Sequence, residues 1–346
     1  MIIVMKTNST EDQLNHIIDS LEESNYGVHL SEGVQRTIIG AIGDEDDKEA
    51  MMMKIRAMNG VEKVVPVLDP YRLTSRDFKP EDTVIDVDGV KIGGDEVVVM
   101  AGPCAVEDEE QILTTAQAVK DAGAKILRGG AFKPRTSPYS FQGLGEEGLE
   151  LLAKARQKTG LKIVTELMDL ENLELVNEYT DIIQIGARNM QNYPLLKAIG
   201  KLDTPIMLKR GMSSTIKEWL LAAEYIMNEG NYQVILCERG IRTFSNETRN
   251  TLDLSSVPLI QEISHLPIIV DPSHGTGKWS LVTPMARAAI AGGVDGLIIE
   301  VHPNPEKAFS DGGQSLTFAN FEIMMREISK VAHVLEREIG FQGAMV

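Results

Sequence analysis

The chain after Gly93 repeats one pattern, in which a short apolar run is followed by a polar loop and an amphipathic stretch with helical spacing. Each repeat predicts a strand and then a helix, with helices such as Glu146–Thr159, Ile216–Asn228, Val282–Ala291 and Phe318–Glu336. The predicted strands are Val97–Met100, Ala124–Arg128, Lys162–Thr165, Ile182–Ile185, Pro205–Lys209, Tyr232–Cys237, Leu266–Val270 and Gly296–Val301. Eight such units in about 250 residues fit an α/β fold, the (β/α)8 TIM barrel. A doubly wound open sheet is the alternative, but the even number of strands favours closure.

The residues before the barrel predict a second, smaller domain. Residues 1–68 have the order strand, helix, strand, strand, helix, strand, which is the α+β plan of a ferredoxin-like (ACT-like) domain. Residues 69–82 are polar and lack periodicity, so we assign them to a linker. Residues 83–346 form the predicted barrel domain. It opens with a hairpin around Asp88-Gly89, a strong turn signal, and we expect this hairpin to plug the bottom of the barrel.

Charge and cysteine content exclude several classes of partner and location. The 346 residues carry 51 acidic and 34 basic side chains, a net charge of −17, which disfavours nucleic-acid and membrane-surface partners. The two cysteines, Cys104 and Cys237, form no disulfide framework and indicate a reducing compartment. No signal peptide follows Met1, and no apolar run approaches the ~20 residues that span a bilayer. We therefore expect a cytoplasmic protein.

Chemically active side chains follow almost every predicted barrel strand, where barrel enzymes place their active sites. Four of them have donor atoms that suit a transition metal with mixed sulfur, nitrogen and oxygen ligands: Cys104, His274, Glu300 and Asp311. The same ends carry the cations Arg128, Lys133, Arg135, Arg188, Lys209 and Arg239, together with Thr136, Glu166 and Ala187. Such cations repel one another in a low-dielectric cleft unless a ligand supplies negative charge. The pattern predicts a small substrate with several anionic groups, two phosphates and a carboxylate.

Simpler interpretations exist for single residues. Cys104 alone could be a small buried hydrophobic residue, and Cys237 is interpreted as inert packing. His274 alone could belong to a capped loop, and Glu300 could support a ligand without being one. Asp311 is the least secure ligand, because aspartate in a Gly-rich loop also forms turns. The position of all four at strand ends favours the metal site.

These residues occur in short motifs that together resemble a known family. The motifs are Gly102-Pro103-Cys104, Lys133-Pro134-Arg135-Thr136-Ser137, Gly186-Ala187-Arg188-Asn189, Leu208-Lys209-Arg210-Gly211, Asp271-Pro272-Ser273-His274 and Glu300-Val301-His302-Pro303. In this order they resemble the 3-deoxy-D-arabino-heptulosonate 7-phosphate (DAHP) synthases over the whole barrel. The leading domain resembles the ferredoxin-like regulatory domain of the type I beta-like subgroup.

The resemblance implies an activity and assigns roles. The activity is condensation of phosphoenolpyruvate with erythrose 4-phosphate, the first step of the shikimate pathway of aromatic amino acid biosynthesis. By similarity, the four metal-type residues would hold Mn²⁺, Fe²⁺, Zn²⁺ or Co²⁺ as a Lewis acid for the aldehyde. The phosphoenolpyruvate carboxylate would be held by Arg128, Lys133 and Lys209. Its phosphate would be held by Arg188, Arg239, Lys209 and the Ala187 amide, and the sugar phosphate by Arg135 and Thr136.

The resemblance also suggests candidates for proton transfer and partners. Lys133, Lys209, Glu166 and His274 are the candidate catalytic residues. Glu166 would position the water or carry a proton, and Lys209 is placed to protonate developing charge. An aromatic amino acid, tyrosine or phenylalanine, is the expected inhibitor, sensed by residues 1–68, and a homo-oligomer, a tetramer, would fit the family. A stability or oligomerisation module is the alternative for the small domain.

Three other functions compete with this one. The nearest is 3-deoxy-D-manno-octulosonate 8-phosphate synthase, which uses arabinose 5-phosphate and typically has an Ala-Asn pair where this chain has Pro134-Arg135. A metal-dependent aldolase that makes pyruvate adducts would not need so many cations. An amino-acid sensor with an inactive barrel would need neither the metal ligands nor the cations.

Overall fold

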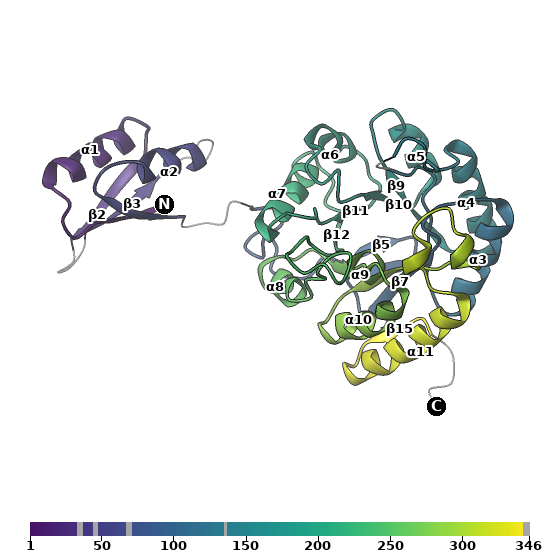
Figure 1. Ribbon diagram of the computed structural model, residues 1–346. Helices are drawn as coiled ribbons and strands as arrows, with labels where there is room; N and C mark the ends of the chain where they lie inside the picture. The colour runs from purple at the N-terminus through teal and green to yellow at the C-terminus, as the bar shows by residue number, and fades with distance from the viewer. Residues whose placement is uncertain (33–36, 44–47, 67–70, 135–136, 342–346) are drawn as a thin grey trace. The chain divides into compact units, whose positions relative to one another are not determined.

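The computed structural model describes residues 1–32, 37–43, 48–66, 71–134 and 137–341 (Figure 1). The chain divides into two compact units, residues 1–70 and residues 71–346. Each unit has its own apolar core, and no residue is shared between those cores. The two units are therefore described separately.

The smaller unit has the ferredoxin-like architecture that the sequence predicts. Its sheet has the antiparallel order β2-β3-β1-β4, and its elements are β1 (Ile2–Met5), α1 (Glu11–Glu22), β2 (Gly27–Glu32), β3 (Thr37–Ile42), α2 (Lys48–Arg56) and β4 (Val61–Val65). Helix α1 begins with a capping box, in which the side chains of Thr10 and Gln13 each bond the other's backbone N–H. Ile3, Ile17 and Ile39 lie in the core between sheet and helices.

The larger unit is a closed parallel barrel, as predicted. Its strands are β7 (Glu96–Gly102), β8 (Ile126–Arg128), β9 (Lys162–Leu167), β10 (Ile182–Ile185), β11 (Ile206–Lys209), β12 (Val234–Glu238), β13 (Ile268–Val270) and β14 (Gly296–Glu300). Strand β14 pairs with β7 from Gly296↔Val98 to Glu300↔Gly102, which closes the sheet and excludes the open alternative.

Helices surround the strands (Figure 1). They are α3 (Glu109–Asp121), α4 (Glu146–Thr159), α5 (Leu173–Tyr179), α6 (Tyr193–Ile199), α7 (Ile216–Met227), α8 (Ser256–Ile263), α9 (Pro272–Thr276), α10 (Trp279–Ala291) and α11 (Phe318–Val334). A short strand, β15 (Glu338–Ile339), pairs with the outer start of β7. None of the helices in the described ranges combines the length and apolarity that crossing a membrane requires.

The predicted hairpin fills one end of the barrel. Strands β5 (Ile85–Val87) and β6 (Val90–Ile92) pair around the Asp88-Gly89 turn. Ile85, Val87 and Ile92 belong to the same buried cluster as inward-facing barrel residues such as Met100 and Cys237. Cys237 is thus packing in the barrel interior, as expected, and the end of the barrel with the strands' N-termini is closed by apolar side chains.

Residues 71–82, which the sequence assigns to the linker, lie against the barrel. The Thr74 backbone N–H donates to Glu224 (2.8 Å), and Ser75 forms a β-bridge with Ser264. The Arg76 guanidinium donates to the Gln261 carbonyl oxygen and pairs with Asp82. Hydrogen bonds and ion pairs, rather than a regular helix or strand, hold this polar stretch against the barrel. Its sequence therefore shows neither helical nor strand periodicity.

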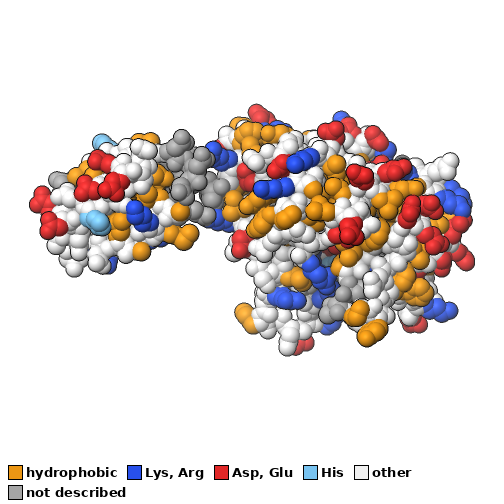
Figure 2. Space-filling view, turned by 90° about the horizontal axis from the view of Figure 1, so that it is seen from above, with side chains coloured by type: hydrophobic (Ala, Val, Ile, Leu, Met, Phe, Trp, Pro, Cys, Tyr) orange, Lys and Arg blue, Asp and Glu red, His pale blue; other side chains and the backbone are white. Residues whose placement is uncertain are grey.

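Acidic and basic side chains are interspersed on the face of the larger unit that Figure 2 presents. Three of the ion pairs in the described residues join two exposed side chains: Lys154–Glu109, Arg287–Glu327 and Arg326–Glu322. Exposed pairs of this kind contribute little stability individually. The charges that matter for function lie elsewhere, at the open end of the barrel.

The buried carboxyl of Asp295, just before β14, is expected to make the free energy of unfolding depend on pH. Burial raises the pKa of its carboxyl to about 6, although the Ile268 N–H (2.9 Å) and Arg337 oppose the shift. Because the folded state holds this proton more tightly than the unfolded state, Asp295 stabilises the fold below about pH 4, and that contribution is lost as the pH rises through 6. The loss is on the order of 3 kcal/mol, at about 1.4 kcal/mol per pKa unit.

We expect Asp295→Asn to be more stable than the wild type at pH 8, with a much smaller difference at pH 4, because the amide keeps the acceptor oxygen and carries no charge. Urea unfolding at both pH values measures this. Asp181→Asn is the matched control, since Asp181 also accepts from a strand amide, Ile163 N–H (2.7 Å), and has a closer arginine partner, Arg156 at 3.2 Å against 3.6 Å between Arg337 and Asp295. An equal difference in unfolding free energy at the two pH values would contradict the assignment.

Candidate active site

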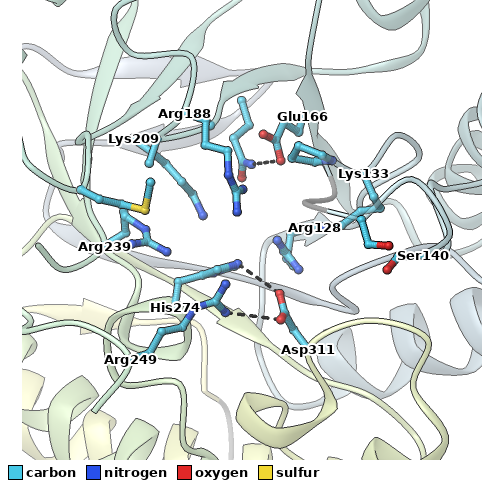
Figure 3. A pocket seen from close by; sticks show the side chains of 16 residues that line it. Arg128, Lys133, Ser140, Glu166, Arg188, Lys209, Arg239, Arg249, His274 and Asp311 are labelled. Carbon is cyan, nitrogen blue, oxygen red and sulfur yellow. Dashed lines mark hydrogen bonds and ion pairs between the residues drawn. The ribbon is translucent and has the colours of Figure 1, made fainter. Parts of the chain in front are cut away.

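A cavity of about 340 Å³ lies at the C-terminal ends of the barrel strands (Figure 3). Its lining includes nine of the predicted site residues: Arg128, Lys133, Glu166, Ala187, Arg188, Lys209, Arg239, His274 and Asp311. The other lining residues are Pro134, Ser137, Ser140, Gln184, Gly186, Met212 and Arg249. Arg135 and Thr136, the predicted ligands of the sugar phosphate, lie outside the described residues.

The four predicted metal ligands come together beside this cavity. Donor atoms of Cys104, Glu300 and Asp311 lie within 4.8 Å of one another. His274 Nε2 lies 3.4 Å from Glu300 Oε1 and 3.9 Å from Asp311 Oδ2. The Cys104 thiol contacts Asp311 Oδ2 at 3.4 Å. One sulfur, one nitrogen and two carboxylates therefore converge, a donor set that fits a divalent transition metal.

The local backbone explains how these ligands meet. Glu300 ends β14, and Cys104 follows the end of the neighbouring β7. A Cβ at Gly102 would lie 2.0 Å from the Arg128 carbonyl oxygen, so only glycine lets β7 approach β8 closely there. Asp311 has φ +53°, a left-handed conformation that aspartate tolerates better than most residues. The turn-forming and ligand interpretations of Asp311 are thus compatible.

Asp271 connects the metal cluster with the cationic side of the cavity. Its Oδ2 atom accepts from Lys209 Nζ (2.6 Å) and from His274 Nδ1 (2.7 Å). Because Nδ1 is occupied, Nε2 of His274 is the nitrogen that faces Glu300 and Asp311. Burial raises the pKa of Asp271, but His274 and Lys209 more than offset it, so the pKa lies well below its ordinary value. Asp271 therefore remains an anion between two donors.

Burial shifts two of the four cluster residues, the thiol and the imidazole, toward their neutral forms. It raises the pKa of the Cys104 thiol to about 11, with a smaller contribution from Glu300. It also lowers the pKa of His274, although Asp271 and Glu300 oppose the change. A protonated thiol leaves the metal-free cluster less negative than a thiolate would, and a neutral imidazole is the form that binds a metal. A bound divalent cation would favour the thiolate.

Two of the predicted substrate cations also contact the metal cluster. Arg128 donates to Glu300 Oε1 (3.0 Å) and to the Pro103 carbonyl oxygen (2.8 Å). Lys133 Nζ donates to the Cys104 carbonyl oxygen (3.0 Å). Both side chains are buried and line the cavity. They therefore lie where a carboxylate could be held next to the metal ligands.

Arg239 differs from Arg128 because it makes no ion pair with an acidic side chain in the described part of the chain, although the charge of Asp271 acts on it. It is 5% exposed, and among the described residues its closest polar contact is a long one, 3.4 Å, to the Gly240 carbonyl oxygen. Burial lowers its pKa, and the Arg249 charge adds to that effect. Arg188 projects into the same cavity from the loop after β10 (Figure 3), also without an ion pair in the described part of the chain. A bound anion would supply the charge that both lack.

On the other side of the cavity, the Glu166 carboxylate accepts from the Gln184 amide (3.2 Å). Glu166 Oε1 lies where a Cβ on Gly186 would be, at 2.0 Å, so glycine at 186 is required for this carboxylate to reach its place. Glu166 faces the cavity near Lys133, as Figure 3 shows. This position suits contact with a substrate or with a water molecule bound there.

Sequence reasoning missed three residues of the site. Arg249 and Gln314 contact the metal carboxylates, but both lie in long loops away from strand ends, so the rule that located the others did not select them. Asp271 stood inside a recognised motif without a role, and only its position between Lys209 and His274 gives it one.

The chain is similar over its length to proteins of known families. Residues 79–336 match the model of the DAHP synthetase I family, and residues 1–69 match that of the DAHP synthase ferredoxin-like domain. The phospho-2-dehydro-3-deoxyheptonate aldolase of Thermotoga maritima is 54% identical, over 97% of this chain and 98% of its own. A 2-dehydro-3-deoxyphosphooctonate aldolase from Syntrophotalea carbinolica is 31% identical, over 73% of this chain and 97% of its own.

Solved structures give the same result. The crystal structure of the Thermotoga maritima DAHP synthase superposes with a TM-score of 0.92 at 53% identity, covering 97% of this chain and 98% of that one. A truncated form of the Thermotoga maritima 3-deoxy-D-arabino-heptulosonate 7-phosphate synthase covers 77% of this chain and 98% of its own, with a TM-score of 0.73. On the family models, the full-length identity and the shared fold, the chain belongs to the DAHP synthetase I family.

Proposed function

We propose that this protein is a DAHP synthase, which condenses phosphoenolpyruvate with erythrose 4-phosphate and water to give DAHP and phosphate. The observation that carries the proposal is the buried Arg239, which makes no ion pair among the described residues, together with Arg188, in a cavity next to a Cys-His-Glu-Asp cluster. The cations suit the phosphate of phosphoenolpyruvate, and the cluster suits a divalent metal, for which we propose Mn²⁺, Fe²⁺, Zn²⁺ or Co²⁺. Such a metal, when bound, supplies a Lewis acid for the sugar aldehyde.

The side chains of this chain then bind and orient the reactants. Arg128, Lys133 and Lys209 hold the carboxylate of phosphoenolpyruvate, while Arg188, Arg239 and the Ala187 amide hold its phosphate. Carbon 3 of phosphoenolpyruvate attacks the aldehyde carbon, water adds at carbon 2, and the carbon–oxygen bond to phosphate breaks.

Proton transfer in this scheme uses two cavity residues. Glu166 orients the water and accepts its proton, because it is the carboxylate across the cavity from the metal ligands. Lys209 protonates developing negative charge, and Asp271 keeps its ammonium directed into the cavity. Arg135 and Thr136 are proposed to bind the sugar phosphate.

The test is phosphate release from phosphoenolpyruvate with Mn²⁺, comparing erythrose 4-phosphate with arabinose 5-phosphate, each with and without EDTA. We expect release with the four-carbon sugar alone, and its loss in EDTA. Release with the five-carbon sugar would move the assignment to octulosonate 8-phosphate synthesis, the activity that the name of the Syntrophotalea carbinolica relative suggests. No release with either sugar would refute both assignments.

We further propose that residues 1–70 sense an aromatic amino acid, tyrosine or phenylalanine, in a cytoplasmic homotetramer. The separate cores of the two units support the expectation that the barrel folds alone. Deleting residues 1–70 should leave turnover within about threefold and abolish inhibition by the amino acid. Turnover rates at saturating substrates measure this, over inhibitor concentrations that span about 1 to 2 orders of magnitude around the half-maximal concentration for the full chain. A truncated enzyme inhibited as strongly as the full chain would place the sensor in the barrel.

A further inference from the structure

The two carboxylates of the metal cluster each direct one oxygen inward and the other outward. Glu300 Oε1 faces His274 Nε2 and also accepts from Arg128, whereas Oε2 accepts from Gln314 Nε2 at 2.6 Å. Asp311 Oδ2 faces the Cys104 thiol and His274, whereas Oδ1 pairs with Arg249 at 3.3 Å. The outward oxygens thus have their own donors, which are separate from the cluster.

Those two donors are also bonded to each other. Arg249 donates to Gln314 Oε1 at 2.9 Å. A guanidinium can only donate, so the Gln314 oxygen must face Arg249, and its amide N–H must then face Glu300. A continuous path runs from Asp311 Oδ1 through Arg249 and Gln314 to Glu300 Oε2.

The backbone fixes both ends of this path. Gln314 is 3% exposed. Two residues after it, Leu316 forms a parallel β-bridge with Val301, which directly follows β14. On the opposite side, the Arg249 backbone N–H donates to the Thr276 carbonyl oxygen (3.0 Å), which ties its loop to the helix that carries His274. Gln314 and Arg249 are therefore held by the same elements that carry the ligands.

We propose that Gln314 and Arg249 are positioning residues that occupy the outward oxygens of Glu300 and Asp311, so that each carboxylate offers a single oxygen to the metal. This inference rests on the proposed metal-dependent function. With two one-oxygen carboxylates, the thiolate and the imidazole, the protein fills four positions and leaves coordination sites for substrate. Partners in this position typically change metal affinity by about 10–100-fold when they are removed.

The experiment titrates chelator-treated protein with Mn²⁺ and with Co²⁺, the latter followed by its visible absorption. Gln314→Ala removes the donor to Glu300. Gln314→Glu keeps the shape but places a second carboxylate against Glu300 Oε2. Gln261→Ala is the matched control, because the Gln261 side-chain amide also donates a hydrogen bond, to the Gly293 carbonyl oxygen. Gln261 lies far from the metal ligands, at the closed end of the barrel.

We expect about a 10-fold or greater weakening of metal binding in Gln314→Ala, a larger weakening in Gln314→Glu, a shifted Co²⁺ spectrum in both, and no change in Gln261→Ala. The KM for phosphoenolpyruvate at saturating Mn²⁺ should stay within about twofold of wild type. Unchanged metal affinity in both Gln314 variants, with apo-protein melting temperatures like wild type, would overturn the inference, as would equal weakening in the control. The titration needs no turnover, so failure of the proposed reaction is recognised separately.

Discussion

Cys104→Ala is expected to abolish metal-dependent turnover, by more than about a thousandfold, while the barrel stays folded. The change removes the only sulfur donor from the described cluster, and metal-ion catalysis supplies several kcal/mol of transition-state stabilisation. The folded structure should survive because the methyl group of alanine fits the space of the buried thiol. Turnover at saturating Mn²⁺ and the far-ultraviolet circular dichroism spectrum measure the two parts of this prediction.

The second cysteine supplies the control for that experiment. Cys237 is equally buried but packs among Met100, Ile235 and Ile269 inside the barrel, and burial raises its pKa so far that it stays a thiol. Cys237→Ala should lose about 1 kcal/mol of stability through the small cavity it leaves and keep its metal affinity. Near-normal activity of Cys104→Ala at saturating Mn²⁺ would remove Cys104 from the set of ligands.

Lys209→Met is expected to impair both activity and stability. The side chain of Lys209 is 4% exposed and pairs with Asp271, which is 1% exposed, at 2.6 Å. Breaking a buried pair leaves an uncompensated charge and typically costs about 3–5 kcal/mol. Because Lys209 also lines the cavity, turnover should fall by about 10²–10³, as when one charge-stabilising donor is removed.

Arg239→Met is the matched comparison, since Arg239 is a buried cavity cation that makes no ion pair among the residues that the structure describes. We expect a raised KM for phosphoenolpyruvate and unchanged or higher stability, because no carboxylate of the described residues forms an ion pair with this guanidinium and Asp271 keeps Lys209 and His274 as donors. Urea unfolding of the metal-free variants at pH 7.5 separates the two cases. Equal loss of stability in both variants would show that Arg239 has a structural partner and would weaken the argument for a bound anion.

The fold could be predicted because apolar periodicity and turn residues mark the strands, helices and hairpin locally in the sequence. Strand β10 and helix α4 have the predicted bounds, Ile182–Ile185 and Glu146–Thr159. The Asp88-Gly89 turn located the hairpin, and the pairing of β14 with β7 decides between a closed barrel and an open sheet of parallel strands. Residues 71–82 are polar and non-periodic, so the sequence assigns them to the linker. Their bonds to Ser264, Gln261 and Glu224 join positions far apart in the chain, and periodicity does not detect such bonds.

The site could be predicted only as far as strand ends determine it. Side chains next to a strand end, such as Glu300 and Lys209, have an orientation that the strand dictates. Arg249 and Gln314 reach the carboxylates from loops whose paths depend on tertiary contacts, so neither spacing nor residue type identified them. The individual roles at the site stay predictions until the variants are measured.

The shared oxygen of Asp271 has a thermodynamic consequence. Oδ2 accepts from Lys209, which lines the cavity, and from His274, which faces Glu300 and Asp311. An anion that draws the ammonium toward itself weakens one bond to this oxygen and so strengthens the other, which alters the imidazole as a metal donor. Affinities for phosphoenolpyruvate and metal are then coupled, and linkage requires that each change the other by the same factor. A titration of either ligand thus reports on the binding of both.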